Sequence, residues 1–494
     1  MRQVQNPQMQ LGELDIGAIP LDPRSRDDIP KLLLGLQHIY REPALREAVF
    51  QILEEVKPRD AAGEPVSSEN GRPGMEQWKI LVLGVLRLGL NTDYDRLHEL
   101  ANQHKTVRQF LGHVEWCDDY QYNPQTLRDN LRLFTPEILD RINRAVVEAG
   151  HVLVKKKPGG GPIDLDPLQA RCDSFVVETH VHYPTDINLL WDAVRKTLTE
   201  ARDLADGFNL PGWRQSRHHI KVFKRHYRRV QKARQQKTAS ETLEAEYLTY
   251  LTLALDHLER SEQLVQQLRD DKVEPKATAA LEGYQGYVRL LVDQIHRRCL
   301  EGEPIPHEEK IFSIFQPHTE WLCKGKAGVP FELGLRVHIV EDPDRFILHH
   351  HLAQKKTDDK VAIPITIETK DRYPRLNAVS FDKGYHSPEN QRVLPTLVDE
   401  VTLPKKGRLN PQEREREQSD RFQDHRRRHS GVESAINALE QGGLDVCPDH
   451  GIDGFKRYVA LAVVARNLKR IGAMIQQQQQ DKERRKRGSY KKAA

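Results

Sequence analysis

Apolar residues recur at helical spacing through the first third of the chain. Between Asp27 and Gly150 they stand three and four positions apart, as in Ile29-Leu32-Leu33-Leu36 and Tyr94-Leu97-Leu100-Ala101, which predicts amphipathic helices. One such helix is predicted from Met75 to Leu88. Residues 1–154 are therefore expected to form a helical N-terminal domain. Short helices joined by tight turns suit helix-turn-helix DNA binding, but a helical dimerisation or scaffold domain would show the same periodicity.

Glycine and proline mark the next boundary. The segment Lys155-Lys-Lys-Pro-Gly-Gly-Gly-Pro162 breaks all periodicity, which predicts the end of the first domain. After it, residues Leu168 to Tyr183 alternate and are rich in Val, Phe and Thr, which predicts one long strand or a strand pair. A helix is expected from Asp186 to about Asp206. The mostly helical stretch that follows is long enough to be an inserted domain, and residues 197–326 are expected to form this helical, basic insertion.

Strand patterns return after the insertion and alternate with helices. The predicted strands are Phe331–Val340, Arg345–Ala353 and Asn377–Phe381, and the predicted helices are Pro364–Tyr373, Pro388–Leu397, Glu433–Gln441 and Gly454–Met474. This order indicates a mixed α/β architecture around a central sheet. Residues 164–196 and 327–475 are expected to form one discontinuous domain, and residues 476–494 a disordered basic tail.

Length and composition narrow the class of protein. A chain of 494 residues exceeds what one hydrophobic core usually serves, so roughly two to four structural units are expected. The net charge is only +4, so a nucleic-acid surface would have to come from local clustering. Five scattered cysteines do not suggest a disulfide framework and favour a reducing cytoplasm. The apolar run Ile80–Leu90 is about half a membrane span, and Met1–Gly12 lacks the apolar region of a signal peptide, so neither membrane insertion nor secretion is expected.

Three acidic residues stand where chemistry would need them. Asp173 lies on a predicted strand, Asp382 directly follows one, and Glu433 begins a late helix. Phosphoryl transfer from a DNA strand uses two divalent ions, one for the attacking and one for the leaving oxygen, and carboxylate oxygens suit Mg²⁺. Without cations, three neighbouring carboxylates would repel one another. Because the chain has 72 acidic residues, the spacing alone is a weak signal.

The segments around these acids resemble the transposases of bacterial insertion sequences. The resemblance covers most of the chain and is strongest to the group catalogued as ISNCY. It rests on four segments, Arg171-Cys-Asp-Ser-Phe-Val-Val-Glu-Thr-His-Val-His-Tyr-Pro-Thr-Asp186, Gly328-Val-Pro-Phe-Glu-Leu-Gly334, Phe381-Asp-Lys-Gly-Tyr-His-Ser387 and Arg428-His-Ser-Gly-Val-Glu-Ser-Ala-Ile436. The resemblance implies an RNase H-like catalytic domain and a DDE triad of Asp173, Asp382 and Glu433 that binds two Mg²⁺, with Mn²⁺ as a substitute.

The resemblance also sets further expectations. Related families often carry an arginine four residues before the last acid and a lysine seven after it, whereas this chain has His429 and Glu440 there. Arg428 is the substitute expected for the arginine. For the first acid, Asp186 is the main rival to Asp173, although it can instead cap a helix that begins at the next residue. Glu178 and Glu332 suit either supporting metal ligands or ordinary exposed strand positions.

The strongest local charge signal lies between Pro211 and Lys237, where ten lysines and arginines occur without any Asp or Glu. Read as a helix, this segment has one partly apolar face and cations elsewhere, which favours phosphate binding over a plain solvated face. The candidate DNA contacts in the whole chain are Arg214, Arg217, Lys221, Lys224, Arg225, Arg228, Arg229, Lys324, Lys326, Lys383 and Arg428.

The expected function is a cytoplasmic DDE transposase. It would bind the terminal inverted repeats of an insertion sequence, as a homodimer on double-stranded DNA, and would cut these ends and join them to target DNA. Two alternatives stay open at this point. One is a stand-alone metal-dependent nuclease without strand transfer, and the other is a DNA-binding protein derived from a transposase in which the acids are relics.

Overall fold

The computed structural model describes residues 2–58, 74–114, 118–155, 167–236, 240–323 and 330–493. These residues form two compact units. Unit 1 combines Met1–Thr179 with Gly328–Ala494, and unit 2 is His180–Ala327. Among the described residues, no helix has both the length and the apolar character needed to cross a membrane.

Unit 1 begins with the predicted short helices. They are α1 (Asp28–Arg41), α2 (Pro43–Leu53), α3 (Gln77–Gly89), α4 (Tyr94–Gln103), α5 (Lys105–Phe110), α6 (Pro124–Leu131) and α7 (Pro136–Lys155). Local capping fixes several of their starts, because the side chains of Asp27, Asp93 and Asn123 accept hydrogen bonds from backbone N–H groups in the first turns of α1, α4 and α6. α3 matches the helix predicted from Met75 to Leu88.

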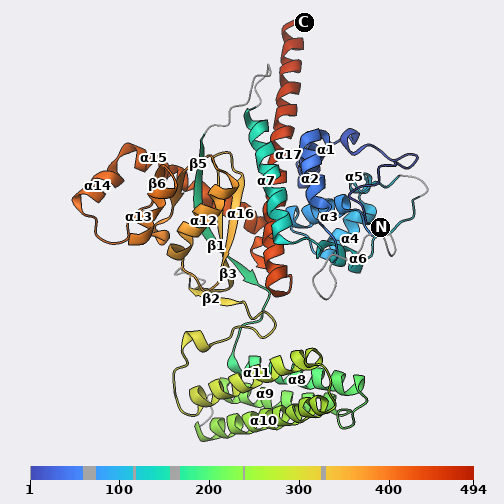
Figure 1. Ribbon diagram of the computed structural model, residues 1–494, viewed down its shortest axis with the longest axis vertical. Helices are drawn as coiled ribbons and strands as arrows, with labels where there is room; N and C mark the ends of the chain where they lie inside the picture. The colour runs from blue at the N-terminus through green and yellow to red at the C-terminus, as the bar shows by residue number, and fades with distance from the viewer. Residues whose placement is uncertain are drawn as a thin grey trace. The chain divides into compact units, whose positions relative to one another are not determined.

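The long C-terminal helix α17 (Gly451–Ala493) packs against α1, α3 and α7, and Figure 1 shows it running beside α7. The approach to α1 is close at two glycines. A Cβ on Gly35 would lie 2.2 Å from the carbonyl oxygen of Leu468, and one on Gly472 would lie 1.7 Å from that of Lys31. The helix continues through the glutamine run expected to be disordered, where Gln476 and Gln480 donate hydrogen bonds to backbone carbonyls near the chain start.

The sheet of unit 1 is mixed, which confirms the predicted α/β class. Its strands are β1 (Leu168–Thr179), β3 (Phe331–Glu341), β4 (Ile347–Ala353), β5 (Leu376–Phe381), β6 (Glu400–Thr402) and β7 (Val446–Cys447). The order is β4-β3-β1-β5-β6, and β7 pairs with the end of β1. β3 runs antiparallel to β1 and to β4, whereas β5 is parallel to both β1 and β6.

Helices connect and cover these strands. They are α12 (Asp358–Arg372), α13 (Pro388–Leu397), α14 (Pro411–Gln418), α15 (Asp420–His429) and α16 (Gly431–Leu439). α12 begins six residues before the predicted helix, since Pro364 lies inside it rather than at its start. Its buried residues Val361, Ala362 and Ile365 pack into the main core, so tertiary packing favours the earlier start.

The N-terminal helices do not form a separate domain, contrary to the division predicted at residue 154. One hydrophobic core joins them to the sheet. Asn143 of α7 donates a hydrogen bond to the carbonyl of Ile347 on β4 and accepts one from Asn467 of α17. His151 of α7 pairs with the buried Asp342 at 2.5 Å. Short helices with one apolar face need a partner surface, and here the sheet and α17 provide it.

Unit 2 is a bundle of helices (Figure 1), and it has its own hydrophobic core. Its helices are α8 (Asp186–Gly207), α9 (Ser216–Gln235), α10 (Ser240–Asp270) and α11 (Pro275–Cys299), followed by the short strand β2 (Glu320–Cys323). The rings of Phe223 and Tyr250 stack at 4.6 Å in this core. The unit starts earlier than the insertion predicted from residue 197, because α8 is one continuous helix that packs entirely within the bundle.

Candidate active site

The three predicted catalytic acids approach one another at one end of the sheet. Cys172 and Phe381 are register partners in the parallel pair β1–β5, so Asp173 and Asp382, the next residue of each chain segment, lie at the same place along the sheet. Glu433 stands in the first turn of α16. Burial, together with the negative charges of Asp382, Asp358 and Glu433, raises the pKa of Asp173 to about 6. Such an influence requires proximity, so the structure brings all three predicted acids together.

Arg171 fixes the position of the helix that carries Glu433. Its Nη1 donates to the carbonyl of Arg428 at 2.9 Å, and its Nε donates to the buried Glu341 at 2.7 Å. The guanidinium lies so close to the start of α16 that a Cβ on Gly431 would be 2.2 Å from its Nη1. Arg171 therefore links β1 and β3 to the α15–α16 junction, and glycine at 431 leaves room for this link.

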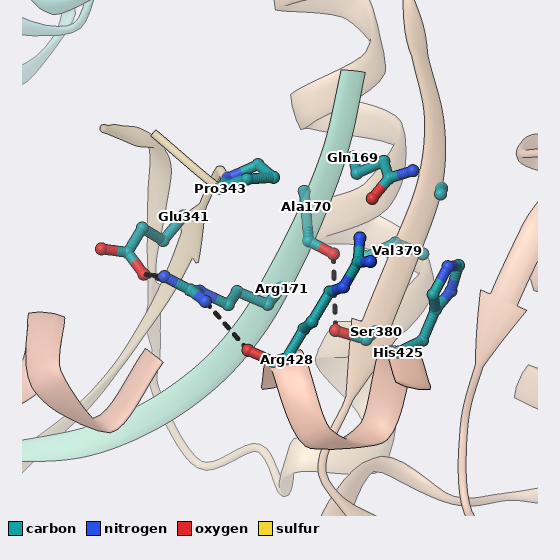
Figure 2. A pocket seen from close by; sticks show the side chains of 10 residues that line it. Gln169, Ala170, Arg171, Glu341, Pro343, Val379, Ser380, His425 and Arg428 are labelled. Atoms are coloured by element: carbon teal, nitrogen blue, oxygen red, sulfur yellow. Dashed lines mark hydrogen bonds and ion pairs between the residues drawn. The ribbon is translucent and has the colours of Figure 1, made fainter. Parts of the chain in front are cut away.

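A pocket of about 330 Å³ lies on the same face of the sheet as the acids. Side chains alternate between faces along a strand, so Arg171 and Ser380 point to the same side as Asp173 and Asp382, one step along each strand. Figure 2 shows Arg171 between Glu341 and Arg428, with His425 on the opposite wall. Both guanidinium groups of this pocket are already engaged, since Arg171 binds Glu341 and Arg428 binds Asp424.

Asp358 is a fourth acid at this site, and sequence reasoning missed it. Its Oδ1 accepts hydrogen bonds from Ser174 Oγ at 3.2 Å and from Arg336 Nη1 at 3.0 Å. A Cβ on Gly384 would lie 3.1 Å from Asp358 Oδ2 and 3.7 Å from Asp382 Oδ2, so glycine keeps the space between the two carboxylates open. The available signal is the adjacent pair Asp358-Asp359, which suits the first turn of a helix, whereas the sequence pattern predicts a helix start only at Pro364.

A buried histidine that carries no charge lies next to Asp358. His338 is fully buried on β3, and its Nδ1 is 2.6 Å from the hydroxyl of Tyr385. Burial lowers the pKa of His338 to about 3, so the ring carries no charge at neutral pH. Its Nε2 lies 3.8 Å from Asp358 Oδ1. His338 therefore does not offset the negative charge, and Arg336 is the cation that does so for Asp358.

The donor set fits divalent magnesium. All four acids offer hard oxygen ligands. Burial is the main cause of the raised pKa of Asp173 and the charges of the other acids add to it, and a bound cation relieves both effects. Within the residues that the structure describes, no three His, Cys, Asp or Glu side chains are already arranged as metal ligands. Asp382 and Glu433 are exposed, so their side chains have room to turn toward an ion.

Two candidate DNA contacts, Lys383 and Arg428, and the nearby His429 also lie at this site. Lys383 directly follows Asp382 and is exposed, while Arg428 pairs with Asp424 at 2.8 Å. His429 hydrogen-bonds Ser380 Oγ through Nδ1 at 3.0 Å. Burial lowers the pKa of His429, whereas the nearby Asp382 raises it. His429 therefore lies near Asp382.

Other candidates lie elsewhere or outside the described residues. Lys324 and Lys326 are not among the residues that the structure describes. Asp186, the rival first acid, belongs to unit 2 and forms an ion pair with Arg298 at 2.9 Å. It does not cap α8, because Asp186 is the first residue of that helix and the capping side chain is Thr185.

Helix α9 carries the predicted basic face. Phe223 and Val230 are buried in the core of unit 2, while the cations point outward. The exposed candidates in and just before α9 are Arg214, Arg217, Lys221, Lys224, Arg225, Arg228 and Arg229. None of them takes part in an ion pair among the described residues. Unpaired cations on one face of a helix form a surface that attracts the phosphates of nucleic acid.

The raised pKa of Asp173 leads to a testable stability effect. The pKa is about 6 in the folded protein and about 4 in an unfolded chain. The stability from this group is therefore complete below pH 4 and is lost as the pH rises through 6. In the absence of metal at pH 7.5, Asp173→Asn should raise the free energy of unfolding by about 2–3 kcal/mol.

Urea unfolding at several pH values measures this effect. The gain in the free energy of unfolding of Asp173→Asn over the wild type should become smaller as the pH falls toward 4. Added Mg²⁺ should stabilise the wild type more than the variant. Equal stability of the two proteins at pH 7.5 without metal would contradict the electrostatic account of this site.

Comparisons of the chain with models of protein families, with curated proteins and with solved structures gave no match.

Proposed function

We propose that the protein is a DDE-type transposase that cleaves and joins DNA at the ends of an insertion sequence. The observation that carries this proposal is the convergence of Asp173, Asp382 and Glu433, three acids from distant parts of the chain, at one end of a mixed sheet. The strand order β4-β3-β1-β5-β6 and the late helix that carries Glu433 are compatible with an RNase H-like catalytic domain.

The chain's own residues divide the work of the proposed reaction. Asp173, Asp382 and Glu433 would hold two Mg²⁺, which supply a more acidic water and neutralise charge on the reacting phosphate. Arg171 orients the start of α16 and thereby Glu433. Arg428 and Lys383 stand beside the carboxylates as cations that can bind the DNA backbone. In this proposal, hydrolysis of a phosphodiester releases a 3′ hydroxyl, which then attacks a phosphodiester of the target and displaces a 3′ oxygen.

The exposed cations of α9 support DNA binding by unit 2. Since transposition joins two ends of one element, the proposal includes a homodimer on double-stranded DNA, acting in the bacterial cytoplasm. A stand-alone nuclease would use the same acids and the same cations, and the difference lies only in whether the 3′ hydroxyl is joined to a second DNA.

The test is an assay of cleavage and joining on labelled DNA that carries the sequences flanking the coding region. With Mg²⁺, the wild type should release 3′ hydroxyl ends and join them to a target plasmid, and chelation should stop both steps. Cleavage without joining would favour the nuclease, whereas binding without Mg²⁺-dependent chemistry would favour a non-catalytic DNA-binding protein.

The role of α9 can be tested by its salt dependence. Replacing Arg228 and Arg229 by Gln should weaken DNA binding and lower the slope of log K against log salt by roughly 0.9 for each lost phosphate contact. A matched control replaces Arg269 and Arg289, which lie in the same unit but are already paired with Glu282 and Glu262.

Fluorescence anisotropy over a range of salt concentrations measures both double variants. The control should keep the wild-type slope. Equal losses in the two double variants would show that the total charge of unit 2, and not the face of α9, governs binding.

A further inference from the structure

A second pocket in unit 1, of about 650 Å³, has more basic than acidic residues in its lining. It lies between the start of α1, the end of α3, the segment after α16 and the middle of α17. The charged residues that line it are Arg26, Asp27, Asp28, Lys31, Arg345, Arg466, Lys469 and Arg470. Six of these are basic and two are acidic, so the lining has an excess of positive charge, and none of them belongs to the proposed catalytic site or to α9.

Both acids of the pocket are already engaged. Asp27 accepts a hydrogen bond from the backbone N–H of Ile29 at 2.7 Å and so caps α1. Asp28 binds Lys31 at 2.9 Å and Lys469 at 2.7 Å. Burial alone would raise the pKa of Asp28, yet the hydrogen bonds from the two lysines outweigh it and lower the pKa. Asp28 therefore stays ionised and neutralises lysine charge. The nearby carboxylates of Glu341, Asp342 and Asp344 act to raise the pKa of Arg470, and Glu341 also acts on Arg466, so they offset part of the arginine charge.

Three arginines gather in this pocket without a carboxylate in ion-pair contact among the described residues. Arg470 donates through Nε to the backbone carbonyl of Asp344, and the Nε of Arg466 is buried without any hydrogen-bond partner. Burial lowers the pKa of Arg466, and the charges of Arg470 and Arg345 lower it further. Glu341 offsets part of this repulsion, but it is bound directly by Arg171. A buried donor such as this Nε is costly unless an acceptor binds it.

Arg345 adds an independent observation. It lies in the turn between β3 and β4 and has a φ of 68°, a left-handed conformation that strains most residues and favours glycine or asparagine. An arginine at such a position is unexpected if the turn alone determines the residue. Its side chain lines the pocket together with Arg466 and Arg470, so this turn brings a third guanidinium group to the same cavity.

We infer that this pocket, formed by Arg345, Arg466 and Arg470, is a binding site for phosphate groups. Several guanidinium groups around one cavity can bind phosphate oxygens in pairs. The volume of about 650 Å³ exceeds what a single phosphate needs, so the ligand is a phosphodiester of a DNA backbone or a free polyphosphate. The site is separate from the acids of the proposed catalytic centre and does not depend on that function.

The experiment uses the full chain and two single variants, Arg345→Asn and Arg470→Gln. Asparagine suits a left-handed turn, so Arg345→Asn should leave the melting temperature unchanged or raise it while it removes a charge from the pocket. Arg41→Gln is the matched control, because Arg41 also donates through Nε to a backbone carbonyl but lies at the opposite end of α1.

Two ligands distinguish the sources of phosphate. Inorganic pyrophosphate is titrated by calorimetry, and a duplex DNA is titrated by anisotropy at fixed salt. We expect each pocket variant to bind at least one of the two ligands with an affinity tenfold or more below that of the wild type. Arg41→Gln should bind both ligands with the wild-type affinity. A loss confined to pyrophosphate identifies a free polyphosphate as the ligand, and a loss of DNA affinity identifies the DNA backbone. Unchanged binding of both ligands in both pocket variants, or an equal loss in Arg41→Gln, overturns the inference.

Discussion

Asp382→Asn should lower the rate of Mg²⁺-dependent strand cleavage by roughly 1,000-fold or more, because it removes a charged metal ligand from a centre whose chemistry depends on charge neutralisation. The substitution should leave the fold intact. Asp382 caps the short turn after β5 by accepting a hydrogen bond from the backbone N–H of Gly384, and asparagine caps such turns equally well. DNA affinity should stay within a few fold of the wild type, since α9 is unchanged.

A matched control is Asp371→Asn, which also removes one negative charge, from an exposed position near the C-terminal end of α12. It should cleave at the wild-type rate. Single-turnover cleavage on preassembled protein–DNA complexes separates the chemical step from binding. If Asp382→Asn cleaves as fast as Asp371→Asn under these conditions, the three acids are not the catalytic centre and the transposase proposal fails with them.

The same cleavage assay compares Asp358, the fourth acid, with Asp382. Asp358 already receives hydrogen bonds from Ser174 and Arg336, so it is less available to a metal than Asp382. Asp358→Asn should therefore reduce cleavage less than Asp382→Asn does. Its effect on Asp173 is electrostatic, so removal of its charge should lower the pKa of Asp173 from about 6, which the pH dependence of stability would show. An Asp358→Asn loss as large as that of Asp382→Asn would instead make Asp358 a direct ligand.

Gly472→Val should destabilise unit 1 by about 3 kcal/mol or more, the largest effect we expect from a single structural substitution. A Cβ at this position would lie 1.7 Å from the backbone carbonyl oxygen of Lys31, and backbone cannot turn aside as a side chain can. The helices α1 and α17 would have to separate. Because α17 also packs on α3 and α7, the separation would disturb the core shared with the sheet.

Gly454→Ala is the control on the same helix. A Cβ there meets its nearest atom at 3.5 Å, which is ordinary contact, so the variant should be as stable as the wild type or gain up to about 1 kcal/mol from better helix propensity. Urea unfolding measures both variants. A Gly472→Val protein with wild-type stability would mean that α1 and α17 do not pack as closely as described.

Much of the fold could be predicted from local patterns. The spacing of apolar residues predicted α3, and the alternating pattern after the glycine-rich linker predicted β1, because both signals arise from neighbouring residues within one element. The start of α12 could not be predicted in the same way. Pro364 suits the first turn of a helix, and only the packing of Val361 and Ala362 into the core places the start earlier.

The candidate site, like the fold, could be predicted from the sequence only in part. Asp173, Asp382 and Glu433 were predicted from their places relative to strands and helices and from the family resemblance. Asp358 was missed, since its proximity to Asp173 depends on how α12 docks on the sheet. The roles of Arg171 and Gly431 were missed for the same reason, because the contact joins a strand to a helix start about 260 residues away.

The sequence by itself determined the helical and strand segments, the acids and the exposed basic face of α9, because periodicity and charge clustering are properties of short windows. The tertiary structure decided that the N-terminal helices share one core with the sheet, that Asp358 lies near the three predicted acids and that arginines from a strand turn and from α17 line one pocket. These features arise from contacts between residues far apart in the chain, where packing and electrostatics depend on the three-dimensional arrangement and leave no local pattern in the sequence.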